Sequence, residues 1–231
     1  MEYLINGLKG ALKIILESDR EFLSIVMVSV KVATTSTMLA AIAGIPFGIF
    51  VAQKKFPGRN IVLTSVNTLM SLPTVVIGLT VYSFLSRVGP LGEIGLLYTL
   101  SAMVIGQFIL AFPILSGVTI AAVRSLDKRI KITLIAMGST PKQGFRMFIH
   151  EARLGILTAL IAGFGRVFAE VGVSMMLGGN IKGYTRNITT AIALETSKGE
   201  FALGIALGIV LLIVAFSVNL ILTNLQKKNT L

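Results

Sequence analysis

Two oppositely charged residues, Arg166 and Glu170, stand four positions apart within an otherwise apolar stretch of the chain. At that spacing two side chains lie on the same face of a helix, so the pair can neutralise itself and let the helix enter an apolar environment. Charged residues inside a membrane also mark polar pathways, where Arg166 would offer positive potential to a passing anion. The two interpretations are compatible, and the sequence alone leaves both open.

Other residues that do chemistry are scarce. The 231 residues include no cysteine and a single histidine, His150, which excludes disulfides and thiolate catalysis and argues against a histidine-built metal site. The pattern G-x-x-x-x-G-K-[S/T], which binds nucleotide phosphates through its backbone amides, does not occur. We therefore expect no catalytic residue, no metal site and no cofactor on this chain.

The composition indicates a membrane protein. Hydrophobic residues make up 54% of the chain, charged residues only 13%, and the mean hydropathy is +0.87. A soluble domain carries about 25% charged residues, so a water-soluble fold is excluded. The net charge of +11 would suggest nucleic-acid binding in a soluble protein, but in a membrane protein it first reports topology.

A helix needs about 20 mostly apolar residues to cross a bilayer. The chain offers this length five times, and the runs are continuously apolar rather than alternating as barrel strands do. The predicted spans are, approximately, residues 22–53, 60–86, 94–123, 154–178 and 201–225. We expect an all-α membrane protein with five transmembrane helices and a single domain over residues 1–231.

Some segments should interrupt or flank these spans. Residues 1–20 repeat leucine and isoleucine at helical spacing between charges, which predicts an amphipathic helix at the membrane interface. Pro73 and two further prolines, Pro46 and Pro113, should kink three of the spans. The Gly178-Gly179-Asn180 segment should end a helix, and residues 188–194 could re-enter the membrane as a gate.

The orientation follows from the basic residues on each side of the predicted spans. Twelve lie on the side that carries residues 124–153 and seven on the other side. Basic residues accumulate in cytoplasmic loops, so we expect 124–153 and the C-terminus in the cytoplasm and the N-terminus outside. No soluble domain is left to present a nucleic-acid groove, and we expect no nucleic-acid partner.

The loop 124–153 is expected to form a helix, a break and a second helix. Ser125 is predicted to cap the first helix, and Gly138 to end it. Thr140-Pro141-Lys142-Gln143 has the pattern of a capping box with proline in the first helical position.

The second helix of this loop would be amphipathic. Phe145, Phe148, Ile149 and Ala152 recur at helical spacing and would share one face. A short amphipathic helix of this kind suits a groove on a partner protein. Equally, the aromatic face could lie on the membrane surface or on the protein's own helices, and the residues alone do not decide between these possibilities.

Gly138-Ser139-Thr140-Pro141 and the aromatic helix after it resemble the cytoplasmic coupling segment of permease subunits of binding-protein-dependent ABC importers. The segment departs from the family signature at Ile132-Thr133-Leu134, where the family has Glu-Ala-Ala, and near His150 and Glu151, where it has Leu-Pro. Residues 151–156, 162–166 and 170–172 resemble the oxyanion branch of the family, and residues 178–181 and 189–200 resemble tungstate permeases in particular.

The resemblance implies the type I importer fold of the methionine-permease kind and a multi-pass protein of the prokaryotic plasma membrane, embedded in lipid. It implies import of tungstate, or of a related oxyanion such as molybdate, by a homodimer. The further partners would be two cytoplasmic ATPase subunits, which bind ATP and Mg, and an extracytoplasmic oxyanion-binding protein. Coupling to the ATPase would fall to Gly138, Ser139, Thr140, Pro141, Phe145, Phe148, Ile149 and Glu151, and Arg166 and Glu170 would lie on the translocation pathway.

A second interpretation is an ion-coupled secondary transporter of a small solute. Such transporters usually contain two related halves and intramembrane acids that bind the coupling ion. Here Glu170 is the only central acid, it has an arginine four residues away, and no repeat relates the two halves of the chain.

Overall fold

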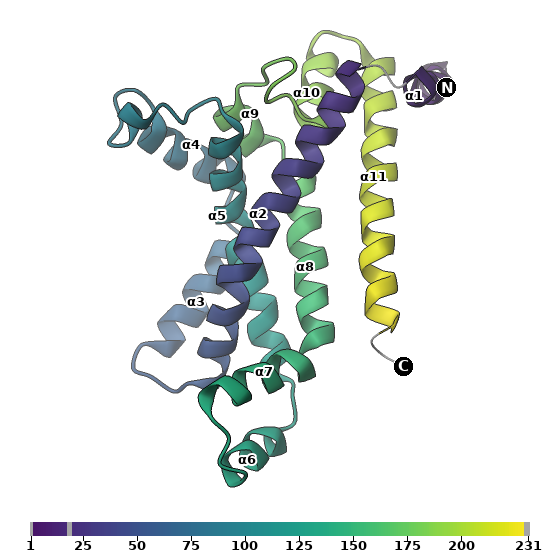
Figure 1. Cartoon of the computed structure of the whole chain (residues 1–231). Helices are drawn as coiled ribbons and strands as arrows, with labels where there is room; N and C mark the ends of the chain where they lie inside the picture. Colours follow the sequence, from purple (N-terminus) through teal and green to yellow (C-terminus); the bar gives the residue numbers. More distant parts are fainter. Residues whose placement is uncertain (1, 18–19, 229–231) are drawn as a thin grey trace.

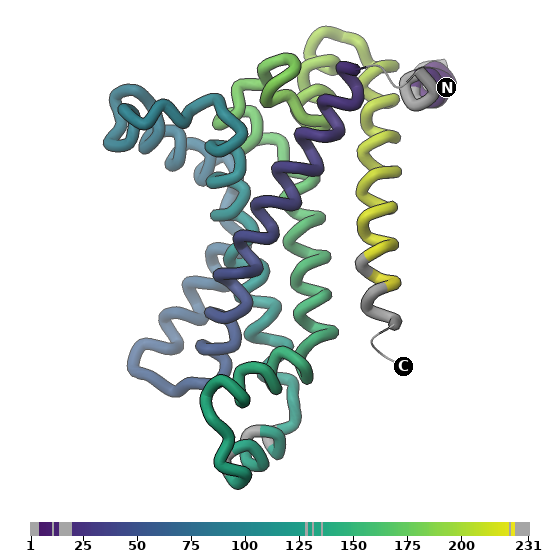
Figure 2. Tube along the Cα trace, in the orientation of Figure 1, coloured from purple at the N-terminus to yellow at the C-terminus, as the bar shows by residue number. Residues whose placement is uncertain are grey.

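The computed structural model describes residues 2–17 and 20–228, and these residues form helices and loops (Figures 1 and 2). The helices are α1 (Glu2–Glu17), α2 (Arg20–Gln53), α3 (Arg59–Met70), α4 (Thr74–Leu85), the 3-10 turn η1 (Gly92–Ile94), α5 (Leu100–Arg124), α6 (Lys128–Ala136), α7 (Pro141–Glu151), α8 (Arg153–Phe168), α9 (Gly172–Gly178), α10 (Ile188–Ser197) and α11 (Phe201–Lys228). The predicted all-α class is confirmed for the described residues.

Three helices are long and apolar enough to cross a membrane without a break: α2, α5 and α11. Two further spans are possible if each bent pair counts as one, α3 with α4 and α7 with α8. By length and composition the described chain therefore has three to five spans, and the predicted five lie at the upper end of that range.

The predicted span 60–86 is two helices rather than one. α3 and α4 meet at an angle of 100° across Ser71, Leu72 and Pro73. Proline has no backbone N–H, and here Pro73 is the N-cap of α4, where that missing donor leaves no helical hydrogen bond unmade. Pro46 and Pro113 instead lie within α2 and α5, and both helices continue through them.

The turn before α3 is held by an arginine. Arg59, the first residue of α3, donates from Nε to the carbonyl of Val51 and from Nη2 to the carbonyl of Ala52, both at 2.9 Å. These carbonyls belong to the last turn of α2, where the helix has no backbone donor for them. One side chain therefore satisfies the end of α2 and ties α3 to it.

Two other predicted spans also differ from the prediction, one in where its helix begins and one by a break. The span 94–123 becomes helical only at Leu100, where the side chain of Thr99 accepts a hydrogen bond from the N–H of Ala102 and caps α5. The span 154–178 is broken at residues 169–171, between α8 and α9.

The core of the bundle lies between α2, α5 and α8 (Figure 1). Small residues allow these helices to approach closely: a Cβ atom on Gly48 of α2 would lie 2.8 Å from the carbonyl oxygen of Ser116 in α5. A Cβ atom on Gly163 of α8 would lie 2.5 Å from Cδ1 of Leu115. Close helix contacts of this kind are typical of membrane bundles.

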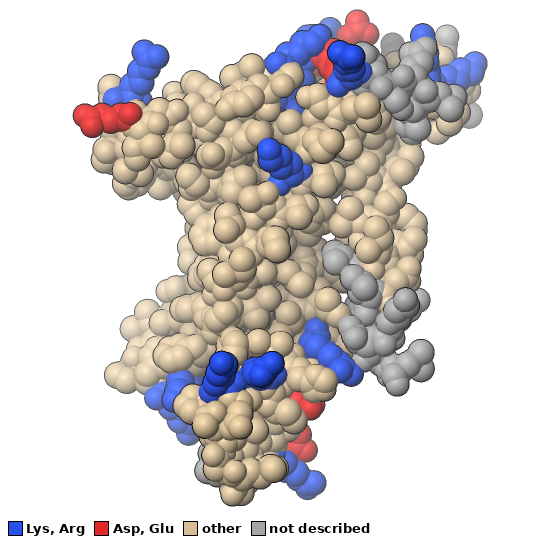
Figure 3. Space-filling view, in the orientation of Figure 1, with Lys and Arg blue, Asp and Glu red and all other residues tan. Residues whose placement is uncertain are grey.

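The helix predicted within residues 1–20 is present as α1, which packs against the first part of α11. Gly7 allows this contact, because a Cβ atom there would overlap Ile205 of α11. In the space-filling view most charged side chains gather toward the two ends of the molecule, and apolar side chains cover the surface between them (Figure 3).

Candidate functional site

The predicted Arg166–Glu170 pair exists. Arg166 Nη1 lies 3.0 Å from Glu170 Oε2 and donates to it. Arg166 is in the last turn of α8, and Glu170 precedes the first residue of α9, Gly172. Each charge therefore lies at the helix end whose dipole it complements. The two side chains differ in burial, since that of Glu170 is 5% exposed and that of Arg166 is 41% exposed.

Glu170 also binds groups from neighbouring helices. Its Oε1 accepts from the backbone N–H of Val173 at 3.3 Å, and its carbonyl oxygen accepts from the hydroxyl of Thr189 in α10 at 2.9 Å. Gly172 leaves room beside the carboxylate, because a Cβ atom there would lie 3.3 Å from Glu170 Oε1 and 3.4 Å from the Thr74 hydroxyl of α4. The carboxylate therefore lies between α8 and α9, with α4 beside Gly172, and the backbone carbonyl of Glu170 connects this junction to α10.

A second buried polar group supports this junction from α10. Asn187 caps α10, and its Oδ1 accepts from Thr190 N and from the Thr189 hydroxyl, both at 2.9 Å. The Thr190 hydroxyl in turn accepts from Asn187 N at 3.1 Å. The cap at Asn187 was not predicted from the sequence, although Asn-x-x-Thr before an apolar run is a capping pattern.

The segment after α9 has part of the predicted structure. Gly179 and Asn180 have positive φ angles of 70° and 52°, and the helix ends there. Residues 188–194 are helical as part of α10, and Figure 1 places α10 beside the beginnings of α2 and α11. A gating role for α10 stays a prediction.

The break between α6 and α7 has the predicted local structure. Gly138, with φ of 63°, follows the end of α6, and the N–H of Ser139 returns to the carbonyl of Leu134. The capping box is complete: Thr140 N donates to Gln143 Oε1 at 2.7 Å, and Gln143 N donates to Thr140 Oγ1 at 3.4 Å. Pro141 begins α7.

The predicted cap of the first helix was wrong. Ser125 is the C-cap of α5, and its hydroxyl donates to the carbonyl of Ala122 at 2.8 Å. α6 begins only at Lys128, after Asp127, whose Oδ1 accepts from the N–H of Arg129 at 2.8 Å. The helix before the loop runs on to Arg124, so Ser125 serves its carbonyl end.

The aromatic face of α7 turns toward the protein's own bundle. Phe148 is buried in a cluster with Ile49, Val123 and Ile156, and Phe145 packs half-buried at the edge of that cluster. The surface left open on α7 includes Met147 and Ile149, while Glu151 is exposed at its end. Phe148 therefore packs on the protein's own helices, which was one of the possibilities that the sequence left open.

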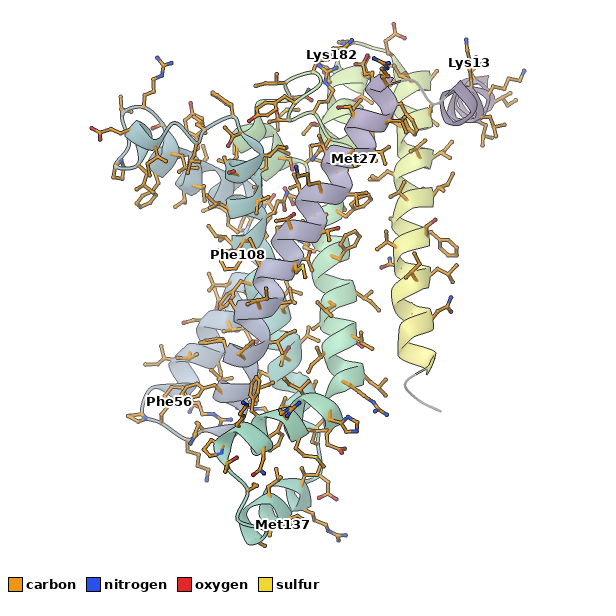
Figure 4. All side chains as sticks on the ribbon, in the orientation of Figure 1. Lys13, Met27, Phe56, Phe108, Met137 and Lys182 are labelled. Carbon is orange, nitrogen blue, oxygen red and sulfur yellow. The ribbon has the colours of Figure 1, made fainter. Side chains whose placement is uncertain are left out.

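α7 projects beneath the bundle, bent by 69° from α8 (Figures 1 and 4). A cavity of about 340 Å³ lies between α7, the preceding loop and the end of α2. Among its lining residues are Ser139, Thr140, Pro141, Phe145 and Phe148. The structure thus gathers most of the predicted coupling residues into one compact unit. Gly138 and Glu151 lie at its two ends.

No group of three or more His, Asp or Glu side chains suited to a metal ion occurs within residues 2–17 and 20–228. His150 is exposed on α7. A further buried polar contact between helices joins Gln107 of α5 to Ser174 of α9, with Nε2 to Oγ at 3.0 Å. It stabilises the packing of the short helix α9.

Residues 44–230 match the sequence model of the family described as binding-protein-dependent transport system inner membrane component, and the chain belongs to this family. It is therefore a permease subunit of an ABC importer, a multi-pass protein of the plasma membrane.

Within the family, the chain is similar to the tungstate uptake system permease protein TupB of Peptoclostridium acidaminophilum, with 37% identity over 99% of this chain and 100% of the relative. It is also similar to TupB of Campylobacter jejuni, with 38% identity over 98% of this chain and 95% of the relative.

A solved structure of the MetNI methionine ABC transporter in an inward-facing conformation shares the fold, with a TM-score of 0.73 at 19% identity. The match covers 90% of this chain and 95% of that chain. This likeness confirms the expected methionine-permease-like fold.

Proposed function

We propose that this chain forms the membrane pathway through which tungstate, or a related tetrahedral oxyanion such as molybdate, enters the cytoplasm. The observation that carries the proposal is similarity to tungstate uptake permeases along nearly the whole chain. The working assembly is a homodimer that receives the anion from an extracytoplasmic binding protein. Two separate ATPase subunits bind ATP and Mg and drive the cycle.

α7 would transmit the motion of the ATPase. A helix that transmits force must be stiff and firmly attached, and α7 has a complete capping box at one end and Phe148 buried in the bundle. Met147 and Ile149 are the exposed apolar side chains that an ATPase groove would cover. We assign the coupling role to this exposed face and an anchoring role to Phe148.

Arg166 would attract the anion without holding it. Its guanidinium has five N–H donors, one nitrogen is engaged by Glu170, and the side chain is 41% exposed. Glu170 balances the charge of Arg166, so what is left for the anion is the set of exposed N–H donors of the guanidinium. A pathway supplied by a separate binding protein needs a weak site of this kind, because tight binding would slow release.

The same assembly requires α6 and α7 on the cytoplasmic side and the N-terminus outside, as the twelve-to-seven distribution of basic residues favours. Because the natural chain has no cysteine, single introduced cysteines report topology cleanly. We expect a membrane-impermeant thiol reagent to label Val88→Cys in intact cells and Met137→Cys only after permeabilisation. Both positions are exposed. The reverse labelling pattern would refute the orientation.

The transport proposal is tested by reconstituting the permease with its ATPase and binding protein in vesicles. We expect tungstate uptake that requires ATP and that molybdate inhibits in competition. Uptake that needs an ion gradient and no ATP would instead establish the secondary transporter, which family membership does not favour.

The coupling role has its own variants in the same vesicles. Met147→Asp with Ile149→Asp places two charges on the exposed face of α7, and we expect loss of ATPase association with normal membrane insertion. Val88→Asp makes the same chemical change at an exposed position after α4 and should leave association unchanged. Equal ATPase binding by the natural protein, the double variant and Val88→Asp would refute the docking role of the exposed face of α7.

A further inference from the structure

A pocket of about 420 Å³ lies at the end of the bundle where α2 and α11 begin, next to α10 and the loop before it. Figures 1 and 3 show this end, where the start of α2, α10 and the start of α11 meet and charges of both signs gather. Neither the ion pair at Glu170 nor the coupling helix α7 contributes to it. The residues that line it are Glu21, Phe22, Ile25, Lys182, Arg186, Ala191, Glu195, Lys198, Leu203 and Leu207.

The pocket has an apolar part and a charged part. Phe22 and Ile25 of α2, together with Leu203 and Leu207 of α11, form the apolar part. Side chains beside it on the same two helices, such as Leu23 and Phe201, are exposed and apolar. Exposed apolar residues at the beginning of two candidate membrane-spanning helices favour contact with lipid over contact with water. An acyl chain there would meet Phe22 and Leu203, whereas Ile25 and Leu207 are buried.

The charged part holds three cations and two carboxylates. Lys182 Nζ lies 2.7 Å from Glu21 Oε2, and Arg186 Nη1 lies 3.5 Å from Glu21 Oε1. Lys198 Nζ lies 2.9 Å from Glu195 Oε1. Figure 4 places Lys182 at this end of the molecule, near the start of α2.

The charged part is incompletely satisfied. The buried Nε of Arg186 has no hydrogen-bond acceptor among the described residues. Lys182 and Lys198 are 67% and 52% exposed, and each keeps donors beyond its single carboxylate contact. A ligand with phosphate oxygens would supply acceptors for the free donors of Lys182 and Lys198.

We propose that this pocket binds the headgroup of a phospholipid that carries both a phosphate and a primary ammonium, as phosphatidylethanolamine does. The phosphate oxygens would accept from Arg186, Lys182 and Lys198, and the ammonium would donate to Glu21 or Glu195. One acyl chain would lie against the apolar part. The combination explains why carboxylates stand among the cations: they would repel a purely anionic headgroup and favour a zwitterionic one.

A peptide segment of the extracytoplasmic binding protein is the competing occupant. Charged residues of both signs suit it as well, but the apolar part of the pocket lies beside exposed apolar side chains of α2 and α11, which favour lipid. We therefore assign the lipid, and the experiment separates the two.

The test uses the full chain in its purified complex and measures bound lipid by native mass spectrometry, with phosphatidylethanolamine, phosphatidylglycerol and phosphatidylcholine added at equal concentration. We expect phosphatidylethanolamine to bind about tenfold more tightly than either of the others, the effect of one charge-assisted contact. Phosphatidylcholine has the same charge but no N–H donor for the carboxylates. Equal binding of phosphatidylglycerol or phosphatidylcholine would overturn the proposal.

Two variants address the pocket itself. Lys182→Gln with Lys198→Gln changes two exposed side chains, so folding is retained, and phosphatidylethanolamine binding should fall about tenfold. Lys9→Gln with Arg87→Gln removes two exposed cations elsewhere and should leave binding unchanged. An equal loss in both double variants would reduce the effect to general surface charge and refute a defined site.

Glu195→Gln tests the preference for phosphatidylethanolamine over phosphatidylglycerol. Removing one carboxylate should weaken phosphatidylethanolamine and strengthen phosphatidylglycerol, which loss of structure would not do. If instead the Lys182→Gln, Lys198→Gln protein keeps its lipid and loses affinity for the binding protein, the pocket is a protein-docking surface. The readout needs no transport, so its failure leaves the proposed function untouched.

Discussion

The unequal burial of Arg166 and Glu170 makes a prediction about which partner the protein can lose. Arg166→Ala leaves a carboxylate that is 5% exposed without its cation. Removing one partner of a fully buried pair costs about 3–5 kcal/mol, and the exposure of Arg166 places this loss at the lower end of that range. Glu170→Gln leaves a guanidinium that is 41% exposed and remains solvated, and the amide oxygen can still accept from Val173 N–H. Glu170→Gln therefore loses only the charge-assisted hydrogen bond to Arg166, which costs about 1.5 kcal/mol.

The double variant separates the cost of a buried charge from the loss of a contact. With both charges gone, no buried carboxylate lacks a partner, so Arg166→Ala with Glu170→Gln should cost about 2 kcal/mol, less than Arg166→Ala alone. A chain of this size loses about 2–4 °C in Tm per kcal/mol. We expect Tm to fall by about 10 °C for Arg166→Ala and about 5 °C for the double variant.

The assay is thermal unfolding, in one detergent, of the natural protein, the two single variants, the double variant and one control variant. Lys31→Ala is the control, since it removes an exposed cation from α2 and leaves no buried acid behind. Its Tm should stay close to that of the natural protein. A double variant whose loss equals the sum of the two single losses would refute the reasoning, and so would an Arg166→Ala protein of unchanged stability.

Two further predictions concern helix packing and helix ends, and both use the same thermal assay. Gly48→Ala should destabilise by about 1–3 kcal/mol, because its Cβ would lie 2.8 Å from the backbone oxygen of Ser116, whereas Gly165→Ala meets nothing within 4 Å and should be neutral or stabilising by up to about 1 kcal/mol. Equal effects at the two glycines would contradict the α2–α5 contact. Arg59→Ala should cost about 2–3 kcal/mol, because two carbonyls of α2 lose a charged donor, and Arg59→Lys should recover only part of it; full recovery by lysine would show that charge alone acts there.

Local signals carried much of the fold. The capping box at Thr140 and Gln143 and the helix end at Gly138 need only residues within one turn of each other, and both have the predicted structure. The ion pair at Arg166 and Glu170 is equally local. Long apolar runs likewise predicted α2, α5 and α11, because a helix that crosses lipid needs a continuous apolar sequence.

Breaks in the other spans were harder to predict. Pro46, Pro73 and Pro113 look alike in sequence, yet only Pro73 lies at a break between helices. Whether a helix turns or continues at proline depends on the neighbours that satisfy the freed backbone groups. Ser125 illustrates the same limit, because a serine between two helices can serve the end of one or the beginning of the next.

The sequence by itself determined that the chain is an apolar helical membrane protein with one charged pair in an apolar stretch and one capped amphipathic helix. Those properties arise from composition and from contacts within a few residues. Only the tertiary structure decided that Phe148 packs inward, that the carbonyl of Glu170 accepts from Thr189 of α10, and that Glu21 meets Lys182 and Arg186. These arrangements depend on segments far apart in the chain, and the packing of whole helices brings them together.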